Sequence, residues 1–144
     1  MRTLIAIAAL VASVSANAGE LDGKSLIYDF DWGGDPVFFM FDEGAVVRCD
    51  ITVEGTTASE ACRDQSQYET YIDTIVWRYV GASYTLNRQS LELVLINERT
   101  TNGAVLGNAE CSLPKSLEAW RDSKSAKVKS RQQAINEQMK NNKI

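Results

Sequence analysis

Three aspartates stand close together near the start of the chain, in Asp29-Phe30-Asp31-Trp32-Gly33-Gly34-Asp35. Paired carboxylates can act as general acid and general base when their surroundings push the two pKa values apart. The segment 19–114 carries 16 acidic residues, so a cluster of three is expected by chance. We therefore interpret Asp29, Asp31 and Asp35 first as turn residues and solubilising surface, and second as an acid and base acting on glycans.

The same segment can be compared with a calcium loop, because Asp at alternate positions followed by Gly can wrap oxygen atoms around a hard cation. It departs from the EF-hand pattern at two positions. Gly33 stands at the third ligand position, and Met40 stands where the loop needs a bidentate Glu. Strands rather than helices are also expected on both sides. We predict no metal site here.

The chain contains no histidine. This excludes a Ser-His-Asp or Cys-His nucleophile, a histidine general base and the commonest zinc and iron ligand sets. Gly-rich phosphate loops and CxxC pairs are also missing from the sequence. We therefore expect no enzyme activity, no catalytic residues and no cofactor.

Aromatic residues offer binding chemistry instead. Trp32 stands beside two glycines in a predicted loop, where an indole often contacts a sugar or a protein. Phe38 and its aromatic neighbours cannot all face one side of a strand, so Phe38 either contacts a ligand or is buried under a C-terminal helix against Trp120. Trp77 and Tyr79 are large inward-facing residues. The candidate ligand-binding residues are therefore Trp32, Phe38, Trp77 and Tyr79, and a filled interior would favour binding at the surface.

Of the three cysteines, Cys49 and Cys111 alternate with polar neighbours and are expected to face inward, whereas Cys62 lies in a polar stretch. In an oxidising compartment, a free thiol at Cys62 would be open to oxidation. We predict a disulfide between Cys49 and Cys62, which would close a loop of roughly 14 residues and contribute about 3 kcal/mol on the chain-entropy model.

Apolar residues recur with a period near two from Lys24 to Leu113, which predicts strands. Short turns between them predict an antiparallel meander, closed or nearly closed as a small barrel, because closure removes exposed sheet edges. The longest non-strand connection is expected over 54–67. The fold class is therefore all-β, with about seven strands at 24–30, 37–41, 45–53, 70–80, 84–86, 90–97 and 104–113.

The pattern changes after Pro114, where sparse apolar residues fit one stripe of a helix. Ser116 is expected to cap this helix and Trp120 to anchor it on the barrel, with fraying beyond Ser123. The segment 19–114 has a net charge of −10 and the segment 115–144 a net charge of +5. An acidic body argues against nucleic acid as the main partner, while the basic tail could contact an anionic surface.

Residues 1–18 have the composition of a cleavable secretory signal peptide. Arg2 is followed by an apolar stretch from Leu4 to Val14 and by Ala16-Asn17-Ala18, with no cysteine directly after the predicted cut. The apolar stretch is about half of the roughly 20 residues that cross a bilayer. We expect three segments, the signal peptide 1–18, a barrel domain 19–114 and a basic helix or tail 115–144, in a periplasmic or extracellular protein.

This layout is similar in outline to compact lipocalin-like barrels and to small periplasmic inhibitor barrels. The resemblance rests on architecture, so it implies no residue roles. The sequence favours an exported, non-enzymatic binding protein whose partner is a small apolar molecule or another protein. The alternatives are a carboxylate-type enzyme acting on glycans and an envelope-associated structural protein that uses its basic tail.

Overall fold

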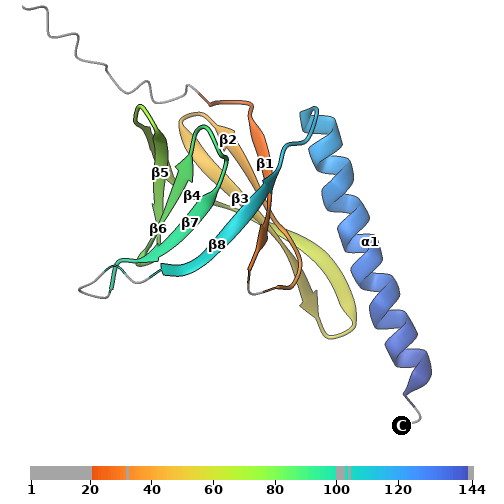
Figure 1. The fold of residues 1–144 in the computed structure, drawn as a ribbon. Coiled ribbons are helices and arrows are strands. Elements are labelled where there is room, and N and C mark those ends of the chain that lie inside the picture. The colour runs from red at the N-terminus through yellow and green to blue at the C-terminus, as the bar shows by residue number, and fades with distance from the viewer. Residues whose placement is uncertain (1–20, 32, 100–102, 104, 143–144) are drawn as a thin grey trace, which may run out of the picture.

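The computed structural model describes residues 21–31, 33–99, 103 and 105–142. Eight antiparallel strands form a closed barrel in which each strand pairs with its neighbours in sequence and β8 closes onto β1. A single helix, α1, runs along one side of the barrel and extends past its end (Figure 1). The elements are β1 (Ser25–Phe30), β2 (Val37–Asp42), β3 (Ala45–Glu54), β4 (Thr57–Thr70), β5 (Thr74–Tyr79), β6 (Ala82–Asn87), β7 (Leu93–Asn97), β8 (Val105–Ser112) and α1 (Leu117–Asn141).

The all-β barrel is confirmed, but the connection expected over 54–67 was wrong. That stretch forms most of β4, a strand of 14 residues. Its side chains are mostly exposed, so it lacks the apolar alternation by which a strand is recognised. β4 is instead held by pairing with β3 from Glu54↔Thr57 to Ala45↔Gln67, and by α1, which contacts it from outside.

Aromatic side chains fill the middle of the barrel. The Trp77 ring stacks on the Tyr84 ring, with centroids 5.1 Å apart, and Phe39 meets both edge-on at 5.4 and 5.6 Å. These side chains are at most 3% exposed. Edge-to-face and stacked pairs add to the stabilisation from burial alone. The inward-facing positions predicted on β5 are confirmed, since Trp77 lies in this core and the partly buried Tyr79 packs against it.

A second, smaller core lies on the outer face of the barrel beneath α1. Phe38, Cys49 and Trp120 form it, with the Phe38 and Trp120 rings 6.1 Å apart and nearly perpendicular. The Trp120 indole N–H donates to the Leu26 carbonyl oxygen at 3.1 Å. Of the two alternatives considered for Phe38, the structure shows burial beneath the helix against Trp120. The expected direction of Cys49 was wrong: it is buried, but against the helix, because alternation predicts burial without saying which face of the sheet is covered.

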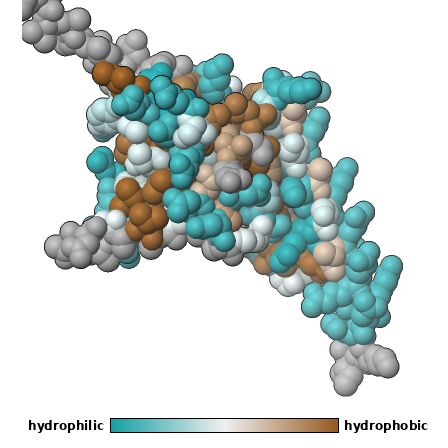
Figure 2. Space-filling model, in the orientation of Figure 1, coloured by the Kyte–Doolittle hydropathy of each residue, from teal (hydrophilic) through white to brown (hydrophobic). Residues whose placement is uncertain are grey.

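The helix α1 begins at the predicted cap, where the Ser116 hydroxyl oxygen accepts from the Ala119 N–H at 3.1 Å. It continues to Asn141, so the fraying expected beyond Ser123 was wrong. A second attachment accounts for this: the Gln132 side chain accepts from the Ala58 N–H and donates to the Thr56 carbonyl, both at 2.9 Å. The face of α1 that Figure 2 shows beyond this point is mostly hydrophilic, although the segment also contains Ile135 and the half-exposed Met139. Among the described residues, no helix has the length and hydrophobicity needed to cross a bilayer.

Candidate functional site

The cleft at one end of the barrel, which we call the mouth cleft, has a volume of about 630 Å³. It lies where the chain enters β1, where β6 leads into β7, and where β8 leads into α1. Phe41, Ile75 and Leu86 belong to the barrel core and form its floor. Its described lining residues are Leu21, Gly23, Lys24, Ser25, Leu26, Phe41, Ile75, Leu86, Arg88, Leu91, Leu113, Pro114, Lys115, Ser116 and Leu117.

The charges at the mouth cleft have one sign. Lys24, Arg88 and Lys115 line it, and none of its described lining residues is acidic. This contrasts with the body of the protein, in which 16 acidic residues outnumber 6 basic ones over positions 19–114. Lys24 and Arg88 are two of those six basic residues, and Lys115 follows directly after this segment. An apolar floor bordered by cations suits a ligand with an apolar part and a negative charge.

Hydrogen bonds hold Leu21 and Asp22, which precede β1, over this end of the barrel. The Tyr68 hydroxyl accepts from the Leu21 N–H at 2.9 Å and donates to the Asp22 carboxylate at 3.0 Å. Asp22 also accepts from the Gly44 N–H at 2.9 Å. Because Tyr68 is a core residue, 2% exposed, the wall that Leu21 forms is attached to the rigid interior of the barrel.

The opposite wall is built by the turn between β6 and β7. The Asn87 side-chain oxygen accepts from the N–H groups of Gln89 and Ser90, each at 2.9 Å. Leu91 follows with a φ of 60°, in the left-handed region that residues with a side chain rarely adopt. The buried Tyr28 hydroxyl donates to the Leu91 carbonyl oxygen at 3.0 Å and so helps to hold it in place. Strained backbone of this kind often occurs at binding sites.

Tyr28 also connects the mouth cleft to the free Cys111. Their side chains are hydrogen-bonded, and they are cross-strand partners on β1 and β8. Burial raises the pKa of the Cys111 thiol, and this effect outweighs the opposing effects of its hydrogen bonds with the Tyr28 side chain and the Ile27 backbone. Burial, together with Cys111, raises the pKa of Tyr28 far above its ordinary value. Cys111 is therefore held as a neutral thiol, which is a poor nucleophile.

A second cleft, which we call the acidic cleft, has a volume of about 800 Å³ and the opposite charge. Asp29, Asp31 and Glu92 line it, and none of its described lining residues is basic. Asp35 lies elsewhere, 3.9 Å from the Arg131 guanidinium of α1. The structure therefore brings together two of the three aspartates singled out in the sequence. The described lining residues are Asp29, Asp31, Ser90, Glu92, Asn108, Ala109 and Cys111.

Metal binding finds no support in the part of the chain that the structure describes. Among those residues, no three His, Cys, Asp or Glu side chains come together in a way that could hold a metal ion.

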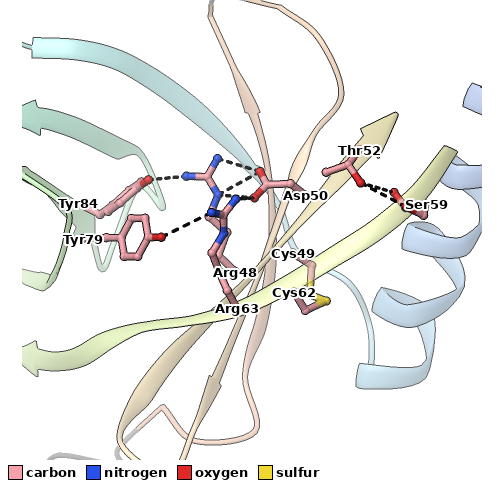
Figure 3. Close-up of polar contacts among 9 residues, drawn as sticks. All are labelled: Arg48, Cys49, Asp50, Thr52, Ser59, Cys62, Arg63, Tyr79 and Tyr84. Atoms are coloured by element: carbon pink, nitrogen blue, oxygen red, sulfur yellow. Dashed lines mark hydrogen bonds and ion pairs between the residues drawn. A yellow bond between two sulfur atoms is a disulfide. The ribbon is translucent and has the colours of Figure 1, made fainter. Parts of the chain in front are cut away.

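Charged side chains on β3 and β4 also contact each other and two tyrosines of β5 and β6 (Figure 3). The Arg48 guanidinium makes a bidentate contact with Asp50 at 2.8 and 2.9 Å and also donates to the Tyr84 hydroxyl. Burial lowers the pKa of Arg48, but the hydrogen bonds to Asp50 and Tyr84 together reverse that effect, and the pKa is raised. The Arg63 guanidinium lies 3.3 Å from Asp50. The group satisfies its own hydrogen bonds, which is the arrangement of a structural network.

Of the ligand-binding residues predicted from the sequence, Trp77 and Tyr79 share the barrel core, whereas Phe38 lies in the separate core beneath α1. Phe38 is fully buried beneath α1, and Trp77 lies in the filled interior, where its indole N–H donates to Gln65 at 2.9 Å. The Tyr79 hydroxyl accepts from Arg63 at 3.5 Å. Trp32 lies outside the described residues.

Sequence reasoning missed the residues that do line the mouth cleft. Lys24, Leu91 and Leu113 lie far apart in the chain, and only barrel closure brings them to the same end. One local signal was available. Leu113 and Leu117 flank Pro114 at the start of a predicted helix, so the sequence places apolar residues at this junction. The structure shows that the barrel does not cover the junction, since Leu113 is 61% exposed.

Comparison with known proteins gives no relative. No protein-family model, no curated protein and no solved structure matches this chain. A function must therefore be argued from the geometry of the chain itself.

Proposed function

We propose that the protein is an exported, non-enzymatic binding protein whose mouth cleft takes a small amphipathic molecule with an apolar part and a negative charge. The observation that carries the proposal is the lining of that cleft. Core residues such as Phe41 and Leu86 form its floor, and every charged residue among its described lining residues is a cation.

The filled interior supports binding at the mouth rather than inside the barrel. Trp77, Tyr84 and Phe39 occupy the space that a ligand would need. The hydrocarbon chain of a ligand lying on Leu91, Leu113 and Leu117 would bury apolar surface of both the ligand and the protein. Each buried methylene group contributes about 0.8 kcal/mol, and part of that sum is lost to the entropy of association. We expect a dissociation constant on the order of 10 μM for a twelve-carbon probe.

Export is supported by the cysteines as well as by residues 1–18, which lie outside the described residues. The predicted disulfide between Cys49 and Cys62 is confirmed, with a sulfur–sulfur distance of 2.07 Å. Disulfides persist mainly in oxidising compartments such as the periplasm and the extracellular medium. The absence of histidine from the sequence supports a binding protein over an enzyme.

Titration calorimetry with dodecanoate, below its micelle concentration, tests this function. We expect dodecanoate to bind at a ratio of one to one and dodecyltrimethylammonium, which has the same chain and the opposite charge, to bind at least tenfold more weakly. The double variant Lys24→Glu/Lys115→Glu should weaken dodecanoate binding by at least tenfold, because it places two carboxylates at the cleft.

The matched control is Lys127→Glu/Lys129→Glu, which makes the same change of net charge on exposed positions of α1. This variant should bind dodecanoate as the unmodified chain does. Equal binding of the two probes, or equal weakening in the two double variants, would show that the lysines at the cleft do not select the ligand. If dodecanoate did not bind at all, the proposed function would be contradicted.

A further inference from the structure

The disulfide between Cys49 and Cys62 has a buried lysine beside it. Lys124 of α1 is 7% exposed, and its ammonium nitrogen lies 3.6 Å from the Cys49 sulfur and 3.8 Å from the Cys62 sulfur. The two cysteines are directly opposite each other on β3 and β4, on the side of the sheet that faces α1 (Figure 3). The sulfurs of the only disulfide among the described residues are therefore in contact with a positive charge.

The other contacts of Lys124 neutralise this charge only in part. The Glu60 carboxylate lies 3.4 Å from the ammonium, but the Glu60 side chain is 44% exposed, so water screens the pair. The Trp120 ring lies 4.3 Å from the ammonium and provides a cation–π contact. A neutral disulfide adds little to these two contacts. A thiolate in its place would add a full opposite charge at less than 4 Å in a largely buried site.

The two cysteines differ in their exposure to solvent. Cys49 is 2% exposed, whereas Cys62 is an exposed residue. A thiolate in solution therefore reaches the disulfide from the side of Cys62 rather than from the side of Cys49. The sulfur that would leave is then the buried one, and it would leave as a thiolate beside the Lys124 ammonium. Which sulfur is attacked, and how well the leaving thiolate is stabilised, control the rate and equilibrium of exchange.

We propose that the Cys49–Cys62 disulfide is a reversible exchange site for a low-molecular-weight thiol. The thiolate of that molecule attacks the Cys62 sulfur and forms a mixed disulfide there. The bond between the two protein sulfurs breaks, and its electron pair stays on Cys49 as a thiolate paired with Lys124. In the reverse step the Cys49 thiolate attacks Cys62 and expels the small thiolate, so no other oxidant or reductant is needed. This inference does not depend on the ligand of the mouth cleft.

Cys111 does not take part in this exchange. It lies on β8, packed against the barrel core on the inner face of the sheet, whereas Cys49 and Cys62 face the helix on the outside. The sheet therefore separates Cys111 from the pair. The exchange reaction therefore involves the Cys49 and Cys62 sulfurs and one external thiol.

Equilibration of the full chain with mixtures of reduced and oxidised glutathione, followed by acid quenching and mass spectrometry, tests the proposal. The fraction of open disulfide is measured for the unmodified chain and for Lys124→Met, Lys124→Arg, Glu60→Gln and Lys129→Met. We expect glutathione on Cys62. The equilibrium constant for opening should fall about tenfold in Lys124→Met, and Lys124→Arg should restore most of it.

The remaining variants separate the charge effect from simple loosening of the fold. Glu60→Gln removes a counter-charge and should raise the opening constant about threefold, and Lys129→Met, on an exposed position of the same helix, should leave it unchanged. A lysine that only packs α1 onto the barrel would give the opposite sign, with easier opening in Lys124→Met. That result, or glutathione found on Cys49, would overturn the proposal.

Discussion

Tyr28 connects the barrel core to the wall of the proposed binding site that Leu91 forms. Its hydroxyl group is buried and donates to the Leu91 carbonyl at the wall of the mouth cleft. A buried phenol can lose its proton only by placing an uncompensated negative charge inside the protein, which is why burial raises the pKa of Tyr28. The same hydroxyl that positions the cleft therefore ties the stability of the fold to pH.

The sign of this dependence follows from the raised pKa values of Tyr28 and Cys111. The folded chain keeps both protons at pH values where the unfolded chain releases them. The contribution of these two groups to the free energy of unfolding is therefore fully present at neutral pH. This contribution falls as the pH rises past the ordinary pKa values, 9.0 for cysteine and 10.0 for tyrosine. Tyr28→Phe should cost about 1 kcal/mol at pH 7 through the lost hydrogen bond and should make the fall above pH 10 shallower.

Urea unfolding at a series of pH values between 7 and 11 measures this effect. Tyr71→Phe is the control, because the Tyr71 side chain is 52% exposed and its pKa is raised mainly by a solvent-exposed hydrogen bond to Glu69 rather than by burial. Its loss should therefore change the pH dependence of stability much less than the loss of Tyr28 does. An equally steep loss of stability in the unmodified chain and in Tyr28→Phe would show that Tyr28 is not the titrating group.

Several residues could be assigned from the sequence because the relevant signal was local. The cap at Ser116, the anchor at Trp120 and the pairing of Cys49 with Cys62 depend on residue type and on near neighbours. The lysines of the mouth cleft could not be assigned in this way. Lys24 and Lys115 are 91 positions apart in the numbering, and only the pairing of β1 with β8 brings their segments together.

The helix α1 is held by few side chains along its 25 residues, and among the described residues only Trp120 and Lys124 are buried. Trp120→Ala would remove the indole from the outer core with Phe38 and would leave the Leu26 carbonyl without that donor. We expect a loss of about 3–5 kcal/mol in the free energy of unfolding. Hydrogen exchange should also become faster along α1, while the strands on the far side of the barrel stay protected.

Met139→Ala is the control for this prediction, because the Met139 side chain is 50% exposed. It should change the unfolding free energy by less than about 0.5 kcal/mol. If Trp120→Ala had no larger effect than Met139→Ala, the helix would not be docked through its first turns.

The strand β4 shows what sequence patterns miss at the scale of elements. Its polar composition predicted a loop, since a strand is recognised by one buried face. β4 needs no such face over most of its length, because β3 supplies its backbone partners and the disulfide fixes its register. The length of α1 was missed for a similar reason, since the contact of Gln132 with the β3–β4 hairpin is a tertiary one.

At the scale of the whole molecule, charge is sorted between two clefts. The mouth cleft has Lys24, Arg88 and Lys115 among its described lining residues, and the acidic cleft has Asp29, Asp31 and Glu92. Composition predicted an acidic body and a basic tail, but it could not show that a basic patch lies at the mouth of the barrel. The barrel itself was predictable, because alternation and short turns are repeated along most of the chain.

The most direct test of the account is a map of amide chemical shifts during titration of the isotope-labelled chain with dodecanoate. We predict saturable shifts at Leu21, Leu91 and Leu117 around the mouth cleft, with Asp29 and Asn108 at the acidic cleft unaffected. Shifts at the acidic cleft, or shifts scattered over the barrel without saturation, would contradict the claim that the mouth cleft is the binding site.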